Sequence, residues 1–106
     1  MTAVRFQPDK LKLSMAGHAG AARFGEDLIC AGLSALWNTL ERALSKDRET
    51  ARRMRPQFTI GDGCRSAACK PLPEAEQDCA LLMRAFADGM KQMAEDFPEF
   101  VGYIEG

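Results

Sequence analysis

The stretch that decides the fold is Asp27–Leu44, with the sequence DLICAGLSALWNTLERAL. Its large apolar residues recur every three or four positions, which places them on one face of an α-helix. These positions are Ile29, Leu33, Leu36, Leu40 and Leu44. Because Asp27 is a favourable N-cap residue, we expect the helix to begin near it. The apolar first half predicts a central, buried helix.

Short strands are predicted on both sides of this helix. Before it, Val4–Phe6 and Leu11–Met15 are separated by Pro8–Lys10, whose residues suit a tight turn. The second of these segments alternates apolar and polar residues, the period of a half-buried strand. After the helix, residues 57–60 and 64–70 flank a glycine-containing turn. Each pair of strands is expected to form a hairpin.

A second amphipathic helix is predicted over residues 74–96, with Pro98 ending it. The highly charged segment 45–55 is expected to be a solvated connection. The order β-β-α-β-β-α predicts an α+β fold, a two-layer sandwich in which two long helices pack on an antiparallel sheet of about four strands. At 106 residues, the chain is expected to form a single domain, 1–106.

Charge and hydropathy restrict the classes of function. A net charge of -1 provides no overall attraction to nucleic acid or membranes, so no direct nucleic-acid binding is required. No segment has the roughly 20 apolar residues that span a bilayer, and Met1–Lys10 does not resemble a signal peptide. We therefore expect a cytoplasmic protein with reduced cysteines. A Cys64–Cys69 disulfide is the alternative, and neither a metal nor a cofactor is expected.

The candidate chemistry lies at the start of the central helix. Cys30 is the third residue of the predicted helix, where unpaired amides and the positive end of the helix dipole favour a thiolate. His18, the one histidine, precedes it in a glycine-rich segment. A cysteine protease needs a thiolate, a nearby base and oxyanion donors. Asp27 is placed to orient the imidazole, and the amides of Cys30 and Ala31 or of the loop are candidate donors.

Each of these features also has an ordinary structural explanation. A single histidine is commonly structural, and free cysteines are often buried packing residues. Phe24, Trp37 and Met15 are candidates for an apolar substrate pocket, or for the core. A cluster of arginines could contact RNA or form a solvated face. Its members are Arg48, Arg52, Arg53 and Arg55.

Two sequence blocks resemble the signature of the ribosomal-processing cysteine protease (Prp) family. The first is Gly17-His18-Ala19, and the second is Gly25-Glu26-Asp27-Leu28-Ile29-Cys30-Ala31-Gly32-Leu33-Ser34-Ala35-Leu36. The resemblance implies an endopeptidase that removes the N-terminal extension of large-subunit ribosomal protein twenty-seven during ribosome maturation, and that forms homodimers. Cys30 is then the nucleophile, His18 the general base and acid, and Asp27 an orienting residue. The peptide is expected to contact Gly17, Ala19, Phe24 and Ser34.

Two other classes of function remain open. The protein could be a non-catalytic ribosome-assembly factor that binds the same ribosomal protein, which only the arginine cluster favours. It could also be a redox-sensing thiol protein built on Cys30, although His18 at the family spacing argues against this.

Overall fold

The computed structural model describes residues 1–17 and 26–106, in which two long helices lie on a five-stranded sheet. The strands are β1 (Thr2–Gln7), β2 (Lys12–Ala16), β3 (Pro56–Gly61), β4 (Cys64–Cys69) and β5 (Val101–Glu105). The helices are α1 (Glu26–Ser45), α2 (Arg48–Met54) and α3 (Glu76–Asp96), with short 3₁₀ turns at Pro8–Lys10 and Pro73–Ala75.

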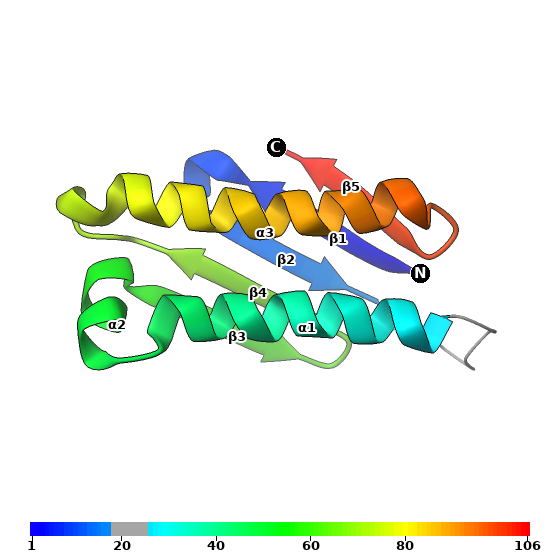
Figure 1. The fold of residues 1–106 in the computed structure, drawn as a ribbon, viewed down its shortest axis with the longest axis horizontal. Helices are drawn as coiled ribbons and strands as arrows, with labels where there is room; N and C mark the ends of the chain where they lie inside the picture. Colours follow the sequence, from blue (N-terminus) through cyan, green and yellow to red (C-terminus); the bar gives the residue numbers. More distant parts are fainter. Residues whose placement is uncertain (18–25) are drawn as a thin grey trace.

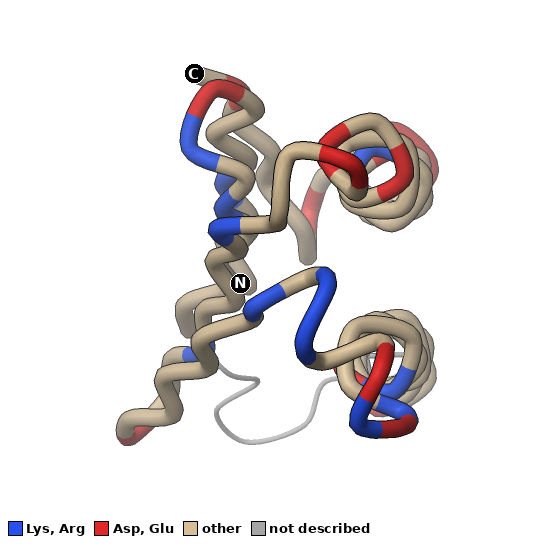
Figure 2. Tube along the Cα trace, turned by 90° about the vertical axis from the view of Figure 1, so that its left-hand side faces the viewer, with Lys and Arg blue, Asp and Glu red and all other residues tan. Residues whose placement is uncertain are grey.

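The sheet has the strand order β3-β4-β2-β1-β5. All neighbouring strands are antiparallel except β5, which runs parallel to β1 (Figure 1). Figure 2 shows α1 and α3 on the same side of the sheet, and no helix of the described residues covers the other face. The predicted α+β fold is confirmed, with one more strand and one more helix than the sequence led us to expect. None of the described helices is long and apolar enough to cross a membrane.

The additional strand and helix are each held by local contacts. The strand β5 pairs with β1, with Val101 opposite Thr2, and directly after β5 the amide of Gly106 donates to the carbonyl of Phe6 at 2.8 Å. The prediction of a solvated connection over 45–55 was wrong, since α2 lies there. The Asp47 side chain caps this helix by accepting the Thr50 amide at 2.7 Å, and the buried side chain of Met54 anchors it.

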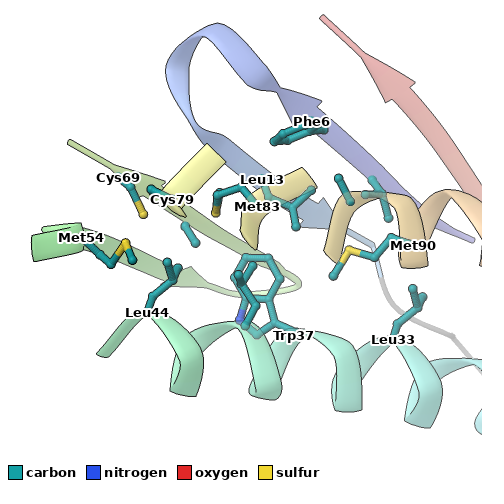
Figure 3. Packing of buried hydrophobic residues seen from close by; sticks show 14 of the residues in the cluster. Phe6, Leu13, Leu33, Trp37, Leu44, Met54, Cys69, Cys79, Met83 and Met90 are labelled. Atoms are coloured by element: carbon teal, nitrogen blue, oxygen red, sulfur yellow. The ribbon is translucent and has the colours of Figure 1, made fainter. Parts of the chain in front are cut away.

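The core lies between the sheet and the two long helices (Figure 3). From α1 it receives Ile29, Leu33, Trp37, Leu40 and Leu44, so Trp37 belongs to the buried stripe and Leu36 lies only at its edge. From the sheet it receives Val4, Phe6, Leu13 and Ala67, and from α3 Cys79, Met83, Ala87 and Met90. The packing fixes α1 along the sheet and thereby positions its first turns over the ends of β2 and β4.

Candidate active site

A cleft of about 190 Å³ opens where the first turns of α1 meet the end of β2 and the turn between β3 and β4. Three chain segments that are distant in sequence therefore border one cavity. The lining residues are Thr2, Met15, Gly17, Cys30, Leu33, Ser34, Gly63, Cys64 and Arg65. Two of them, Cys30 and Arg65, carry groups that react or ionise and are half-buried. No carboxylate belongs to this described lining.

Cys30 and Ser34 reach the cleft from the same side of α1. Residues four apart lie one above the other on a helix, which explains why both side chains border the cavity. The helix begins at Glu26, so Cys30 is its fifth residue and not the third. Its amide and that of Ala31 therefore lie beyond the four amides that a helix leaves unpaired, which makes them poor oxyanion donors. The first-turn amides and the glycine-rich segment remain as candidates.

Gly17 ties the end of β2 to the β3–β4 turn. Its amide donates to the carbonyl of Gly63 at 2.8 Å, and its φ of 96° lies in the region that favours glycine. A Cβ at this position would overlap the carbonyl oxygen of Met1. Glycine is therefore required here by both conformation and space, at the residue directly before His18.

Several predicted site residues lie outside the described part of the chain. His18, Ala19 and Phe24 belong to residues 18–25, so their predicted roles stay predictions. Asp27 is exposed and does not line the cleft. Its predicted contact with the imidazole is therefore untested. The structure thus brings together Cys30, Ser34 and Gly17 from the predicted set.

Of the three large side chains considered for an apolar pocket, the two that are described have different positions. Met15 lines the cleft beside Cys30. Trp37 is fully buried in the core, with its indole N–H donating to Glu41 Oε1, and does not border the cleft. Trp37 is therefore a core residue and no part of the substrate pocket.

The four cysteines are free thiols in different environments. Cys69 and Cys79 face each other in the core (Figure 3), where the hydrogen bond to Cys79 and burial raise the pKa of Cys69. Cys64 and Cys69 do not form the disulfide that was the alternative, because both are free thiols. Alternation along β4 turns the Cys64 side chain to the opposite face of the strand from Cys69, where its Sγ lies against Gly61, and at this end of the strand Cys64 also borders the cleft.

The arginine cluster is partly neutralised by the protein itself. Arg52 pairs with Glu49 at 2.6 Å, and Arg53 pairs with Asp78 at 3.1 Å. These pairs favour a solvated face over an RNA-binding surface. Within residues 1–17 and 26–106, no group of three or more histidine, cysteine or acidic residues could hold a metal ion.

The sequence profile of the family described as cysteine protease Prp matches residues 1–102. This chain belongs to that family. The chain is thus a cysteine protease, and its cleft holds the half-buried thiol of Cys30, whose role as the nucleophile stays a prediction. No curated protein sequence matches it significantly.

Solved structures have the same fold. The ribosomal processing protease Prp of S. aureus, with a covalently linked product peptide, has a TM-score of 0.78 and 19% identity, covering 100% of both chains. Its complex with a substrate peptide gives 0.74 and 17%, again over 100% of both chains. A protein of Streptococcus mutans gives 0.66 and 25%, covering 99% of this chain and 93% of that one. The Prp fold therefore extends over the whole chain.

Among the described cleft residues that sequence reasoning did not assign to the site, Arg65 carries the one charged side chain. Arg65 lines the cavity next to Met15, its partner in the β2–β4 register. The sequence of β4 carried little signal, because the residue between the buried Ala67 and Cys69 is Ala68 and not a polar one. In the strand, Arg65 lies on the same side as Ala67 and Cys69, since side chains two apart share a face. Only the pairing of β4 with β2 brings that side next to Cys30.

Proposed function

We propose that this protein is a cysteine endopeptidase that removes the N-terminal extension of large-subunit ribosomal protein twenty-seven. The observation that carries the proposal is the cleft in which the half-buried Cys30 meets Gly17, the residue before His18. Membership of the cysteine protease Prp family supports it. The S. aureus Prp complexes with substrate and product peptides support a peptide as the ligand of the corresponding cleft.

The proposed reaction is acyl transfer through a thioester. The Sγ of Cys30 attacks the carbonyl carbon of the scissile bond, and backbone amides stabilise the oxyanion. His18 takes the thiol proton and gives it to the leaving amine when the C–N bond breaks. A water molecule then attacks the thioester while His18 accepts its proton, which releases the carboxylate product and regenerates the thiol. Asp27 orients the imidazole in this proposal.

The cleft explains why an extended peptide is a suitable substrate. Met15 and Leu33 provide an apolar surface beside Cys30, and Ser34 provides a hydroxyl one helical turn further along α1. Such a combination of apolar lining and few polar groups is typical of peptide and small-ligand sites. Ser34 is therefore proposed to bind the substrate and not to act as a second nucleophile.

The test is cleavage of the full-length ribosomal protein carrying its extension, followed by mass spectrometry of the products. Cys30→Ala and His18→Ala should each lower the rate by at least about a thousandfold, because nucleophile and base act as a unit. Cys64 is the other thiol that borders the cleft, so Cys64→Ser is the matched thiol control; cleavage should persist, because the Sγ of Cys30 is the proposed nucleophile. Full cleavage by Cys30→Ala would refute the proposal. Binding without cleavage by the wild-type protein would instead indicate a non-catalytic assembly factor.

We also infer from the family resemblance that the protein acts in the cytoplasm as a homodimer. Light scattering after size exclusion tests the second point, and a mass of one chain at micromolar concentration would contradict it. Cell fractionation followed by detection of the cleaved ribosomal protein tests the first.

A further inference from the structure

Arg65 occupies an unusual position for a charged residue in this fold. It lies on the helix-facing side of β4, where it pairs with Met15 on β2 and with Ile60 on β3. The next residues on that side of the strand, Ala67 and Cys69, are buried in the core. Arg65 is half-buried and borders the cleft together with Cys30. A cation therefore lies on the wall of the cavity that contains the nucleophile.

This cation lacks a counter-charge within the described residues. Three other arginines, Arg52, Arg53 and Arg84, have carboxylate partners. The guanidinium of Arg65 makes no ion pair or hydrogen bond with any residue of 1–17 or 26–106, and no acidic residue lines the cleft there. A partly desolvated charge without a partner is costly, and the cost is recovered when a ligand supplies the missing acceptor.

We propose that Arg65 is a specificity-determining residue that binds an aspartate or glutamate side chain of the peptide substrate. The inference deepens the proposed function and rests on it. A guanidinium presents parallel N–H donors that match a carboxylate in a bidentate arrangement. The apolar side chains of Met15 and Leu33 line the same cleft, which lowers the local dielectric constant and strengthens such a pair. A carboxylate is thus preferred over the neutral amide of the same shape.

The experiment compares pairs of peptides that differ only in charge. The probe is a decapeptide spanning the extension junction of the ribosomal protein, in which each position in turn is replaced by Glu or by Gln. At one position or more, the kcat/KM of the wild-type protein should be about tenfold higher for the Glu peptide than for the Gln peptide. The difference should come from a lower KM. Arg65→Gln should abolish that ratio, and Arg65→Glu should favour Lys at the same position.

Controls separate this role from a general effect on the fold or the chemistry. Arg48→Gln removes a cation from α2, at the opposite end of α1 from the cleft (Figure 1), and should leave the Glu-to-Gln ratio unchanged. Arg65→Lys should retain part of the ratio because it keeps the charge without the fork. If Arg65→Gln lowered kcat equally for the Glu and Gln peptides and left the Glu-to-Gln ratio of kcat/KM unchanged, the inference would be overturned. Arg65 would then act on the reactivity of Cys30 and not on the choice of substrate.

A binding measurement distinguishes failure of this inference from failure of the proposed function. The Cys30→Ala protein is titrated with the same peptides by fluorescence anisotropy. A preference for binding the Glu peptide that disappears when Arg65→Gln is added supports the inference. This holds even if the wild-type protein cleaves none of the peptides, because absence of cleavage would count against the proposed function alone. Equal affinity for every Glu and Gln pair, or no binding of any peptide, overturns the inference.

Discussion

Replacement of Gly17 by alanine should strain the point where β2 is joined to the β3–β4 turn. The φ of 96° costs an alanine about 1 to 2 kcal/mol. The new Cβ also overlaps the carbonyl oxygen of Met1, which is backbone and cannot rotate away as a side chain would. Overpacking of this kind costs about 1 to 3 kcal/mol. We therefore expect Gly17→Ala to lower the free energy of unfolding by about 3 kcal/mol.

Thermal and urea unfolding followed by circular dichroism measure this loss. About 3 kcal/mol corresponds to a fall in melting temperature of about 12 °C or more for a domain of this size. Two glycines provide matched controls. Gly106 has a φ of 111° with nothing within 4 Å of a new Cβ, so Gly106→Ala reports conformational strain alone. At Gly102 the nearest atom is Met1 Sδ at 4.0 Å, so Gly102→Ala should be nearly neutral.

The comparison of these variants decides whether the overlap is real. If Gly17→Ala loses no more stability than Gly106→Ala, the Met1 carbonyl does not restrict this position and the reasoning fails. If the predicted loss is seen, the cleavage assay should show an additional fall in activity, because the residue borders the cleft and directly precedes His18.

Three further predictions concern the core, a helix cap and an ion pair. Leu40→Ala, at a fully buried position, should lower the free energy of unfolding by about 2 to 5 kcal/mol in urea titrations, whereas Leu81→Ala, 72% exposed, should change it by less than about 0.5 kcal/mol. Asp47→Ala should lower the melting temperature and Asp47→Asn should largely preserve it, because an amide oxygen can still accept the helix amide. The hydrogen bond and charge of Arg84 hold the pKa of Glu105 below its ordinary 4.5. The Arg84–Glu105 pair therefore stabilises the fold above pH 4.5, and this stabilisation is lost as the pH falls through the lowered pKa. Glu105→Gln should thus be less stable than wild type at pH 7 and equal to it at the acid end of a pH series of melting temperatures.

The elements that the sequence predicted are those with strong local signals. The α1 stripe and the α3 periodicity are long enough for packing to follow from spacing alone, and the hairpin turns at Pro8–Lys10 and 61–63 are marked by their residue types. The buried stripe of α1 contains Trp37, whereas the sequence predicted Leu36. The two residues are adjacent, and apolar spacing alone does not decide which of them faces the core.

The elements that were missed depend on contacts between distant residues. β5 is stabilised as a strand by parallel pairing with β1, about 100 residues earlier, and carries little periodicity of its own. The charges of α2 conceal its one buried anchor, Met54, although Asp47 three residues before Thr50 was a usable N-cap signal.

The candidate site was predictable where a motif carries it. Cys30, Ser34 and Gly17 were named from the signature and line one cleft, while their roles in catalysis and binding stay predictions. Arg65 was not found, because its position depends on the register of β4 against β2 and on the placement of α1 above both strands. Neither the register nor the helix placement can be obtained from residue spacing within one segment.

The unequal exposure of the four thiols gives a way to count functional molecules. Cys69 and Cys79 are shielded in the core, whereas Cys64 is exposed at the border of the cleft and would react alongside Cys30. In a Cys64→Ser background, Cys30 becomes the one thiol that an alkylating reagent reaches readily. The stoichiometry of iodoacetamide incorporation into the folded protein would then report the fraction of competent enzyme in a preparation, and its loss of reactivity on adding peptide would measure occupancy of the cleft.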